Sequence, residues 1–140
     1  MTYNIKLDSD GVNWEEVCDV IRKAGLSTHP VEIMKSAFEN SHLKVFIFDN
    51  DKLIGTGRAI SDGAYQAAIY DIAVLPEYHK KGIGKIIMDE LHSKLAGFNI
   101  ILYANPTAEN FYKKLGYSKM LTGMAVFKNE ASMRSRGFID

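Results

Sequence analysis

The spacing of apolar and polar residues divides this chain into short segments of strand and helix character. Strand-like alternation or an unbroken apolar run occurs in seven segments: residues 3–7, 43–48, 53–60, 67–74, 99–103, 117–121 and 124–128. Apolar positions at helical spacing occur in four segments: residues 14–24, 30–38, 83–97 and 106–115. This order predicts an α/β fold with a mixed, strongly twisted sheet, closed by a hairpin of the last two strands.

The composition narrows the class of protein. With 46% hydrophobic and 24% charged residues, the 140 residues are expected to form one globular domain. The 17 basic and 17 acidic residues cancel, which argues against a large nucleic-acid surface. No apolar run approaches the roughly 20 residues that span a bilayer, and the N-terminus does not resemble a signal peptide. The single Cys18 forms neither a disulfide nor a metal site with the scattered histidines, so we expect a reducing cytoplasm.

The loop before the helix at Ile83 has several neighbouring residues suited to binding an anion. Gly82 and Gly84 lack a Cβ, so a phosphate can approach their backbone closely. The unpaired N–H groups and positive dipole end of a helix N-terminus attract anions. Three lysines add charge to the same loop: Lys80, Lys81 and Lys85. The loop is therefore predicted to bind a pyrophosphate.

Two common phosphate motifs do not fit this loop. The dinucleotide pattern G-x-G-x-x-G needs a glycine where Ile87 stands, and a P-loop needs Ser or Thr where Ile86 stands. Residues 76–84, Pro-Glu-Tyr-His-Lys-Lys-Gly-Ile-Gly, resemble the acyl-CoA pyrophosphate loop P-x-x-[Q/R]-x-x-G-x-[G/A] of the GCN5-related N-acetyltransferases (GNAT). His79 departs from the Gln or Arg of that pattern. The alternative is a plain helix cap in a surface loop.

A second segment strengthens the resemblance. Residues 105–117, Asn-Pro-Thr-Ala-Glu-Asn-Phe-Tyr-Lys-Lys-Leu-Gly-Tyr, are similar to the family signature N-x-x-A-x-x-F-Y-x-K-x-G-[F/Y], and the likeness covers roughly residues 43–127. It implies a single-domain GNAT-type fold over residues 1–140, with about seven strands and four helices. Two central parallel strands, ending at Val74 and Tyr103, would splay apart. The implied partners are acetyl-CoA and a small amine, and family habit suggests a homodimer.

The resemblance also implies which residues hold acetyl-CoA. The pantetheine arm would pair with the backbone of the first splayed strand, which would also polarise the thioester carbonyl. The residues carried over from that strand are Ile72, Ala73 and Val74. The residues carried over from the pyrophosphate loop are His79, Lys80, Lys81, Gly82, Ile83, Gly84 and Lys85. The second motif contributes Asn105, Ala108 and Tyr112, although Asn105 could equally cap a helix.

Three residues are candidates for the chemistry. In the resembling family, the tyrosine matching Tyr112 gives a proton or hydrogen bond to the leaving thiolate; the alternative is that it only packs in the core. Tyr70 and Asp71 are candidates for handling the amine's proton, but neighbours face one cleft only if the strand bulges. Residues 57–63 with Tyr70 and Asp71 look similar to the plastid serotonin N-acetyltransferase branch, in which the matching aspartate is functional. The alternative for Asp71 is an ion pair with Arg58.

The acceptor is less defined by the sequence. An apolar mouth could be lined by Met34, Phe38, Tyr65 and Tyr70, and Asp62 or Glu39 could attract an ammonium group. Two other functions stay open: an acetyltransferase of protein lysines or N-termini, and a non-catalytic module that senses acyl-CoA.

Overall fold

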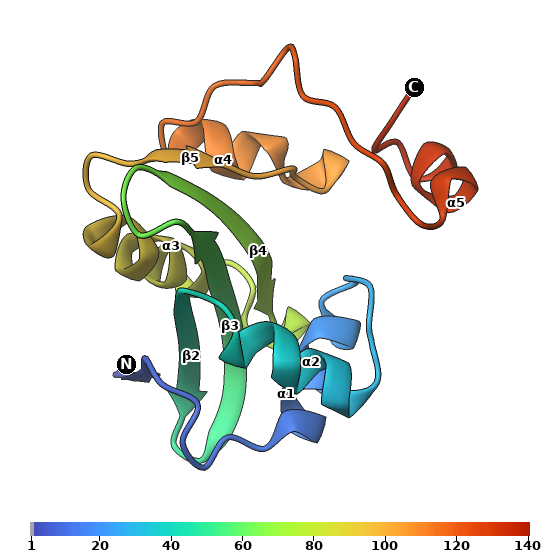
Figure 1. Cartoon of the computed structure of the whole chain (residues 1–140). Helices are drawn as coiled ribbons and strands as arrows, with labels where there is room; N and C mark the ends of the chain where they lie inside the picture. The colour runs from blue at the N-terminus through green and yellow to red at the C-terminus, as the bar shows by residue number, and fades with distance from the viewer. Residues whose placement is uncertain (1) are drawn as a thin grey trace. The chain divides into compact units, whose positions relative to one another are not determined.

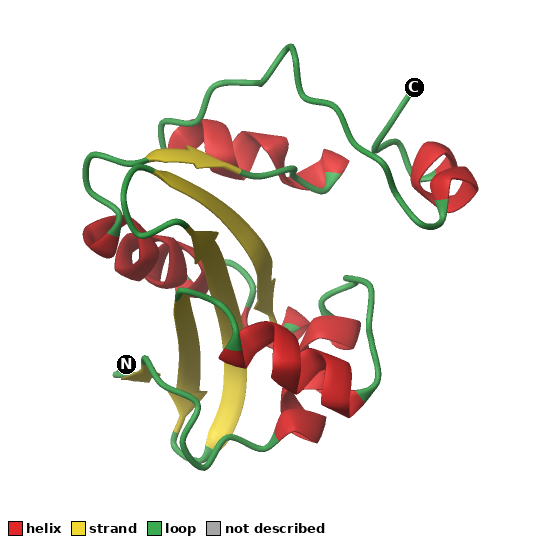
Figure 2. Cartoon of the chain, in the orientation of Figure 1, coloured by secondary structure: helices red, strands yellow, loops and turns green. Residues whose placement is uncertain are grey.

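The computed structural model describes residues 2–140, which divide into two compact units. The first ends at Leu102 and the second begins at Tyr103, and each is described by itself. The strands all belong to the first unit: β1 (Asn4–Lys6), β2 (Leu43–Asp49), β3 (Lys52–Ser61), β4 (Gln66–Val74) and β5 (Asn99–Ile101). They form one sheet in the order β1-β2-β3-β4-β5, antiparallel throughout except for the parallel pair of β4 and β5 (Figures 1 and 2).

Helices cover both faces of this sheet (Figure 1). The helices of the first unit are α1 (Trp14–Lys23), α2 (Val31–Glu39) and α3 (Ile83–Lys94), with a short 3-10 turn, η1 (Pro76–Tyr78). On one face, the Phe38 ring of α2 stacks on Phe46 of β2 at 5.5 Å, and Trp14 of α1 meets the same Phe46 at 6.1 Å. On the other face, α3 lies against the two glycines of β3, Gly55 and Gly57. The mixed α/β sheet expected from the sequence is confirmed.

Helix α1 begins directly after an asparagine that caps it. The Asn13 side chain accepts hydrogen bonds from the backbone N–H groups of Glu15 and Glu16, which satisfies two otherwise unpaired donors. Glu16 does not return to Asn13, as a full capping box would. Its Oε2 instead accepts from the N–H of Leu53 at 3.0 Å, and so links α1 to the start of β3.

The second unit contains helices but no strand. Its elements are η2 (Pro106–Ala108), α4 (Glu109–Lys114) and α5 (Glu130–Ser135). The Tyr103 ring meets Phe127 at 5.4 Å and Phe138 at 5.9 Å, which ties the two ends of the unit together.

The predicted closing hairpin is wrong. Residues 117–128 form no strand, and the described chain has five strands where about seven were expected, and five α-helices where four were expected. Three apolar side chains of this segment are almost fully exposed: Leu121 at 89%, Met124 at 95% and Val126 at 102%. Alternating apolar residues stabilise a strand only where a partner ladder and a face to bury are available, and a lone two-stranded hairpin is marginal in water.

Candidate active site

Strand β4 bulges at Asp71. In the register of β3 and β4, Asp71 and Ile72 both stand opposite Gly57, so β4 carries one extra residue there. Asp71 has a φ of 57°, in the left-handed region that a non-glycine residue rarely adopts. Strain of this kind persists only where the surroundings fix it, and it is concentrated at functional sites.

The bulge brings Tyr70 and Asp71 to one guanidinium group. The Arg58 Nε–H donates to Asp71 Oδ2 at 2.7 Å. The Cζ of the same side chain lies 5.3 Å from the centroid of the Tyr70 ring. Neighbours on a regular strand face opposite sides, so both candidates could serve one site only through a bulge, and the structure has one.

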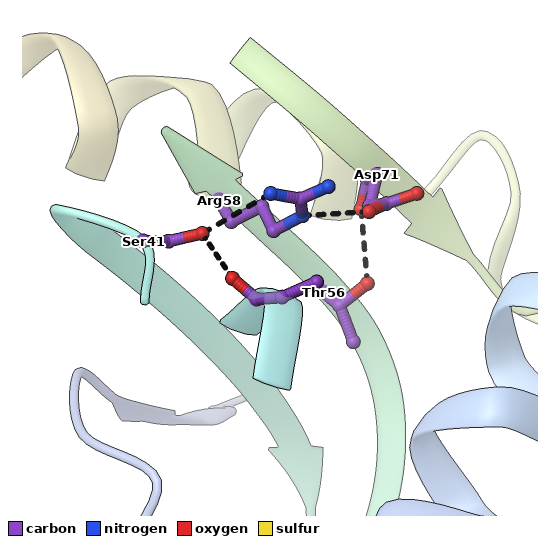
Figure 3. A network of polar contacts seen from close by, with 5 residues as sticks. Ser41, Thr56, Arg58 and Asp71 are labelled. Carbon is purple, nitrogen blue, oxygen red and sulfur yellow. Dashed lines mark hydrogen bonds and ion pairs between the residues drawn. The ribbon is translucent and has the colours of Figure 1, made fainter. Parts of the chain in front are cut away.

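Arg58 is itself held by residues of α2 and the turn that follows it (Figure 3). Its Nη1–H donates to Ser41 Oγ at 3.2 Å, and the Ser41 hydroxyl donates to the Ala37 carbonyl oxygen at 2.7 Å. The Cζ lies 5.7 Å from the Phe38 ring centroid. The expected alternative for Asp71, an ion pair with Arg58, is therefore present, with the two side chains only 14% and 20% exposed.

A buried hydroxyl fixes the backbone of the bulge. Thr56 is 0% exposed, and its Oγ1–H donates to the Asp71 carbonyl oxygen at 3.0 Å (Figure 3). This bond satisfies a carbonyl that the bulge removes from the regular ladder. Neither Thr56 nor Ser41 was predicted, because a threonine in a strand and a serine after a helix carry no signal of such contacts.

Strands β4 and β5 diverge after three residue pairs. Parallel pairing joins Gln66–Ala68 to Asn99–Ile101, and β4 then continues to Val74 without β5 beside it (Figure 1). The parallel pairing is thus as short as the expected splay requires, but β5 ends at Ile101 and not at Tyr103 as predicted. Ile72, Ala73 and Val74 lie on the diverged part of β4, where an extended arm could pair with their backbone.

The loop between β4 and α3 ends at a glycine that begins the helix. Gly82 is the N-cap of α3 with a φ of 80°, and a Cβ added there would meet no atom within 4 Å. No side chain caps the first N–H groups of α3, so these donors can bind an anion. Ile83 and Gly84 form the first turn; the Ile83 side chain is buried, so only its backbone can contribute to such a site.

His79 turns back onto the end of β4. Its Nε2 lies 3.0 Å from the carbonyl oxygen of Val74, a distance at which the ring N–H donates a hydrogen bond. The residue that departs from the family pattern therefore fixes the start of the loop to the strand that precedes it.

The lysines of the loop differ in their contacts. Lys80 and Lys81 are exposed, and Lys80 has a left-handed φ of 64°. Lys85 Nζ lies 2.7 Å from Asp89 Oδ2, in a pair whose side chains are 64% and 56% exposed. Exposed pairs of this kind contribute little in water, so Lys85 can exchange Asp89 for a phosphate.

Tyr112 lies in a cluster of rings in the second unit. Its ring centroid is 5.0 Å from that of Phe111 and 5.7 Å from that of Tyr117. Burial raises the pKa of Tyr112, and raises that of Tyr117 to about 12. A phenol in such surroundings keeps its proton at neutral pH and can therefore act as a donor.

The other two candidates of the second motif begin its helix. Asn105 Oδ1 accepts from the backbone N–H of Thr107 at 3.1 Å and from its hydroxyl at 2.8 Å, so Asn105 caps η2. Ala108 precedes α4 as its N-cap. The capping role of Asn105 was one of the two expected alternatives.

The residues considered for the acceptor mouth are corrected in part. Met34 and Phe38 are 1% and 0% exposed, so they belong to the core and do not line a mouth. Asp62 Oδ1 accepts from three successive N–H groups, which lower its pKa and make it part of the β3–β4 turn. Tyr65, by contrast, is 62% exposed.

A shallow hollow of about 230 Å³ lies at the other end of β4. Its lining residues are Ile60, Ser61, Asp62, Gln66, Ala67, Ala68 and Ile101. In the register of β3 and β4, Ala68 pairs with Ile60 and Tyr70 pairs with Arg58. The two pairs are two residues apart on each strand, so their four side chains lie on one face of the sheet. The hollow therefore continues the face that carries Arg58 toward the β3–β4 turn.

Residues 2–140 contain neither a metal-binding cluster nor a membrane-spanning helix. No three His, Cys, Asp or Glu side chains of this range come together to hold a metal ion. None of its helices is long and apolar enough to cross a membrane.

Comparisons with known proteins agree with the geometry. The sequence profile of the acetyltransferase (GNAT) family matches residues 13–117, across the boundary between the two units. The uncharacterized N-acetyltransferase ycf52 of Pyropia yezoensis is 33% identical over 112 residues, which cover 75% of this chain and 63% of that protein. The chloroplastic serotonin N-acetyltransferase 2 of Oryza sativa subsp. japonica is 26% identical over 144 residues, covering 95% and 72%.

A solved structure gives the same result. A GNAT-family acetyltransferase of Streptococcus pneumoniae superposes with a TM-score of 0.77 at 26% identity, covering 92% of this chain and 100% of that one. The ycf52 protein is longer, so this chain spans less than two thirds of its length.

Proposed function

The chain belongs to the acetyltransferase (GNAT) family, and we propose that it transfers the acetyl group of acetyl-CoA directly to a primary amine of a small molecule. One observation carries this proposal: β4 diverges from β5 after Ala68, bulges at Asp71 and leads into an uncapped helix N-terminus. An extended thioester can lie along the diverged strand while its pyrophosphate meets the helix.

The residues present fit acetyl-CoA. The backbone of Ile72, Ala73 and Val74 binds the pantetheine arm and polarises the thioester carbonyl. The pyrophosphate lies against the backbone N–H groups of the α3 N-terminus, where Gly82 leaves space for it. The loop side chains add hydrogen bonds and charge: His79, Lys80, Lys81 and Lys85. Asn105 and Ala108 of the second motif are the remaining residues proposed to bind acetyl-CoA.

An amine that binds as the ammonium ion must lose a proton to become a nucleophile, and Asp71 takes it, directly or through a water molecule. The neutral nitrogen attacks the thioester carbon, and the C–S bond of the tetrahedral adduct breaks, so that the CoA thiolate leaves. The nitrogen loses an N–H proton as the amide forms, which balances the proton that the thiolate gains. Tyr112 gives that thiolate a proton or a hydrogen bond, since its buried phenol is protonated at neutral pH. Tyr70, stacked on the Arg58 group that binds Asp71, is the alternative path for the amine's proton.

The hollow at the start of β4 supports a small acceptor. Its volume of about 230 Å³ is below that of pockets for drug-sized ligands, roughly 300–1,000 Å³. Ala68 is three residues from Asp71, about 10 Å along a strand. The serotonin N-acetyltransferase of rice is named for a small amine, which favours this class over protein lysines or N-termini. A non-catalytic acyl-CoA sensor would have no use for a strained aspartate beside the thioester site.

The proposal extends to the partners, the compartment and the oligomeric state of the protein. We treat residues 1–140 as one domain, without a nucleic-acid or membrane partner, that acts in a reducing cytoplasm and assembles as a homodimer. The neutral charge balance supports the lack of a nucleic-acid partner, and the single cysteine supports the reducing compartment.

Release of free CoA thiol, measured across a panel of acceptors, tests the function. The panel contains small aryl- and alkylamines, a lysine peptide and a peptide with a free N-terminus, and a sample without an amine corrects for hydrolysis. We expect turnover with at least one small amine and much slower turnover with either peptide. Tight acetyl-CoA binding without turnover on any acceptor would favour the sensor, and preference for a peptide would favour the protein acetyltransferase.

A further inference from the structure

The ion pair at the β4 bulge engages one side of the Asp71 carboxylate. Arg58 Nε donates to Oδ2 at 2.7 Å. The Asp71 side chain is 20% exposed. The carboxylate therefore has one oxygen bound to Arg58, while part of its surface stays open to a ligand.

Four contacts leave the Arg58 side chain little freedom. Its fork bridges Asp71 and Ser41, and its Cζ lies over two aromatic rings, 5.7 Å from the Phe38 centroid and 5.3 Å from the Tyr70 centroid. Ser41 is 6% exposed and bonded in turn to the Ala37 carbonyl oxygen at the end of α2. A planar guanidinium can make this set of contacts, whereas a lysine ammonium cannot.

Stability alone does not account for the arrangement. In an ion pair of low exposure, the free-energy cost of removing both charges from water offsets most of their attraction. The left-handed φ of Asp71 adds strain. What the contacts do achieve is a fixed position: Thr56 holds the Asp71 backbone, and Arg58 holds its side chain (Figure 3).

We propose that Arg58 is a positioning residue, which orients the Asp71 carboxylate toward the acceptor amine and is itself anchored to α2 through Ser41. This inference rests on the proposed function, because it gives Asp71 the role of handling the amine's proton. It adds a residue outside both sequence motifs, and it makes the end of α2 part of the site's support.

A double-mutant cycle tests the proposal. Arg58→Lys keeps the charge and removes the fork; we expect kcat/KM for the amine to fall about tenfold, with acetyl-CoA affinity unchanged. In the Asp71→Asn background the same substitution should have no further effect, since Arg58 acts through the Asp71 carboxylate. Arg22→Lys is the matched control: Arg22 binds Asp19 at 2.9 Å in an exposed pair, and the rate should stay at the wild-type value.

The outcomes separate this inference from the proposed function. If the unaltered protein acetylates no amine, the proposed function fails and this inference fails with it. If it is active and Arg58→Lys keeps the full rate, or loses the same factor with and without Asp71→Asn, Arg58 has no positioning role while the proposed function stands. If Arg58→Lys does not fold, Ser41→Ala removes only the anchor: a loss of about two- to threefold, absent in the Asp71→Asn background, supports the proposal, and an unchanged rate overturns it.

Discussion

The Tyr78 hydroxyl donates a hydrogen bond of 2.6 Å to Asp49 Oδ2, and so ties the loop after β4 to the end of β2. Lys52 reinforces the link, since its Nζ lies 5.5 Å from the centroid of the Tyr78 ring and 3.4 Å from Glu77 Oε2. The loop proposed to bind the pyrophosphate is therefore anchored to the β2–β3 turn. The bond to Asp49 is the main cause that raises the pKa of Tyr78 to about 12.

This anchor predicts a pH-dependent difference in stability. The pKa of Tyr78 is higher in the folded chain than the ordinary value of 10, so the stabilisation is complete below about pH 10 and is lost as the pH rises through about 12. We expect Tyr78→Phe to melt lower than wild type at neutral pH, and the difference to close between pH 10 and 12. Tyr65→Phe, which removes an exposed hydroxyl, is the control. A difference that persists at pH 12 would contradict the anchor.

Gly84→Val tests the pyrophosphate loop. A branched side chain in the first turn of α3 would occupy the approach to the backbone N–H groups without disfavouring the helix. We expect acetyl-CoA to bind at least tenfold more weakly by calorimetric titration, or roughly 1.4 kcal/mol. Gly123→Val, at a position where a Cβ would meet only the Met120 side chain, should bind normally. A folded Gly84→Val variant with normal affinity would exclude this binding mode.

Tyr112→Phe tests the proton donor. The ring keeps its contacts with Phe111 and only the hydroxyl is lost, so kcat should fall by roughly 10² while acetyl-CoA affinity stays within a few fold. Because burial raises the pKa of Tyr112 above 10, its loss of the proton should slow the wild type only above about pH 10. Tyr117→Phe removes a hydroxyl from the same ring cluster and should retain the rate. If the two substitutions lower kcat equally, the hydroxyl of Tyr112 contributes to packing and not to proton donation.

Asp71→Asn tests the proposed role of Asp71 in taking the amine's proton. Asparagine tolerates a left-handed φ and keeps an acceptor for Arg58, so the fold should persist. We expect kcat to fall by roughly 10². Partial recovery should occur at high pH, where more of the acceptor amine is already neutral. Asp19→Asn, in an exposed pair with Arg22, is the control. If Asp71→Asn lowers the melting temperature and leaves the pH–rate profile unchanged, Asp71 has only a structural role, as the partner of Arg58.

Gly57→Ala tests the packing behind the bulge. A Cβ at this position would lie 2.5 Å from Ile87 Cγ2 and 2.7 Å from Ile72 Cδ1, both closer than van der Waals contact. We expect the free energy of unfolding in urea to fall by about 1–3 kcal/mol. Gly123→Ala should change it by less than about 0.5 kcal/mol. Unfolding of Gly57→Ala at the wild-type urea concentration would show that α3 can shift to make room.

Local signals predicted much of this fold. The apolar spacing predicted the first helix over residues 14–24, and the observed α1 spans Trp14–Lys23. The three strands before the loop and the helix that begins at Ile83 also follow their apolar patterns closely. These elements form as expected because each pattern is short-range and each element has a face to bury.

Features that depend on contacts between elements were not predictable. From the sequence, Tyr70 and Asp71 could face one cleft only if the strand bulged. The bulge itself is visible only in the register of β4 against Gly57 of β3. The buried hydroxyls of Ser41 and Thr56 act through partners far along the chain. The hairpin expected over residues 117–128 fails for the opposite reason: its alternation is clear, but its apolar side chains find no face to bury.

Gly57 has a consequence for anyone who redesigns this protein. Its missing side chain lets Ile87 of α3 and Ile72 of β4 meet across one backbone position, directly behind the bulge that holds Asp71. Libraries that repack the buried face of α3 for heat resistance would thus alter the support of the proposed reaction centre from the far side of the sheet. Variants selected there should be screened for turnover as well as for melting, since the two properties share this contact.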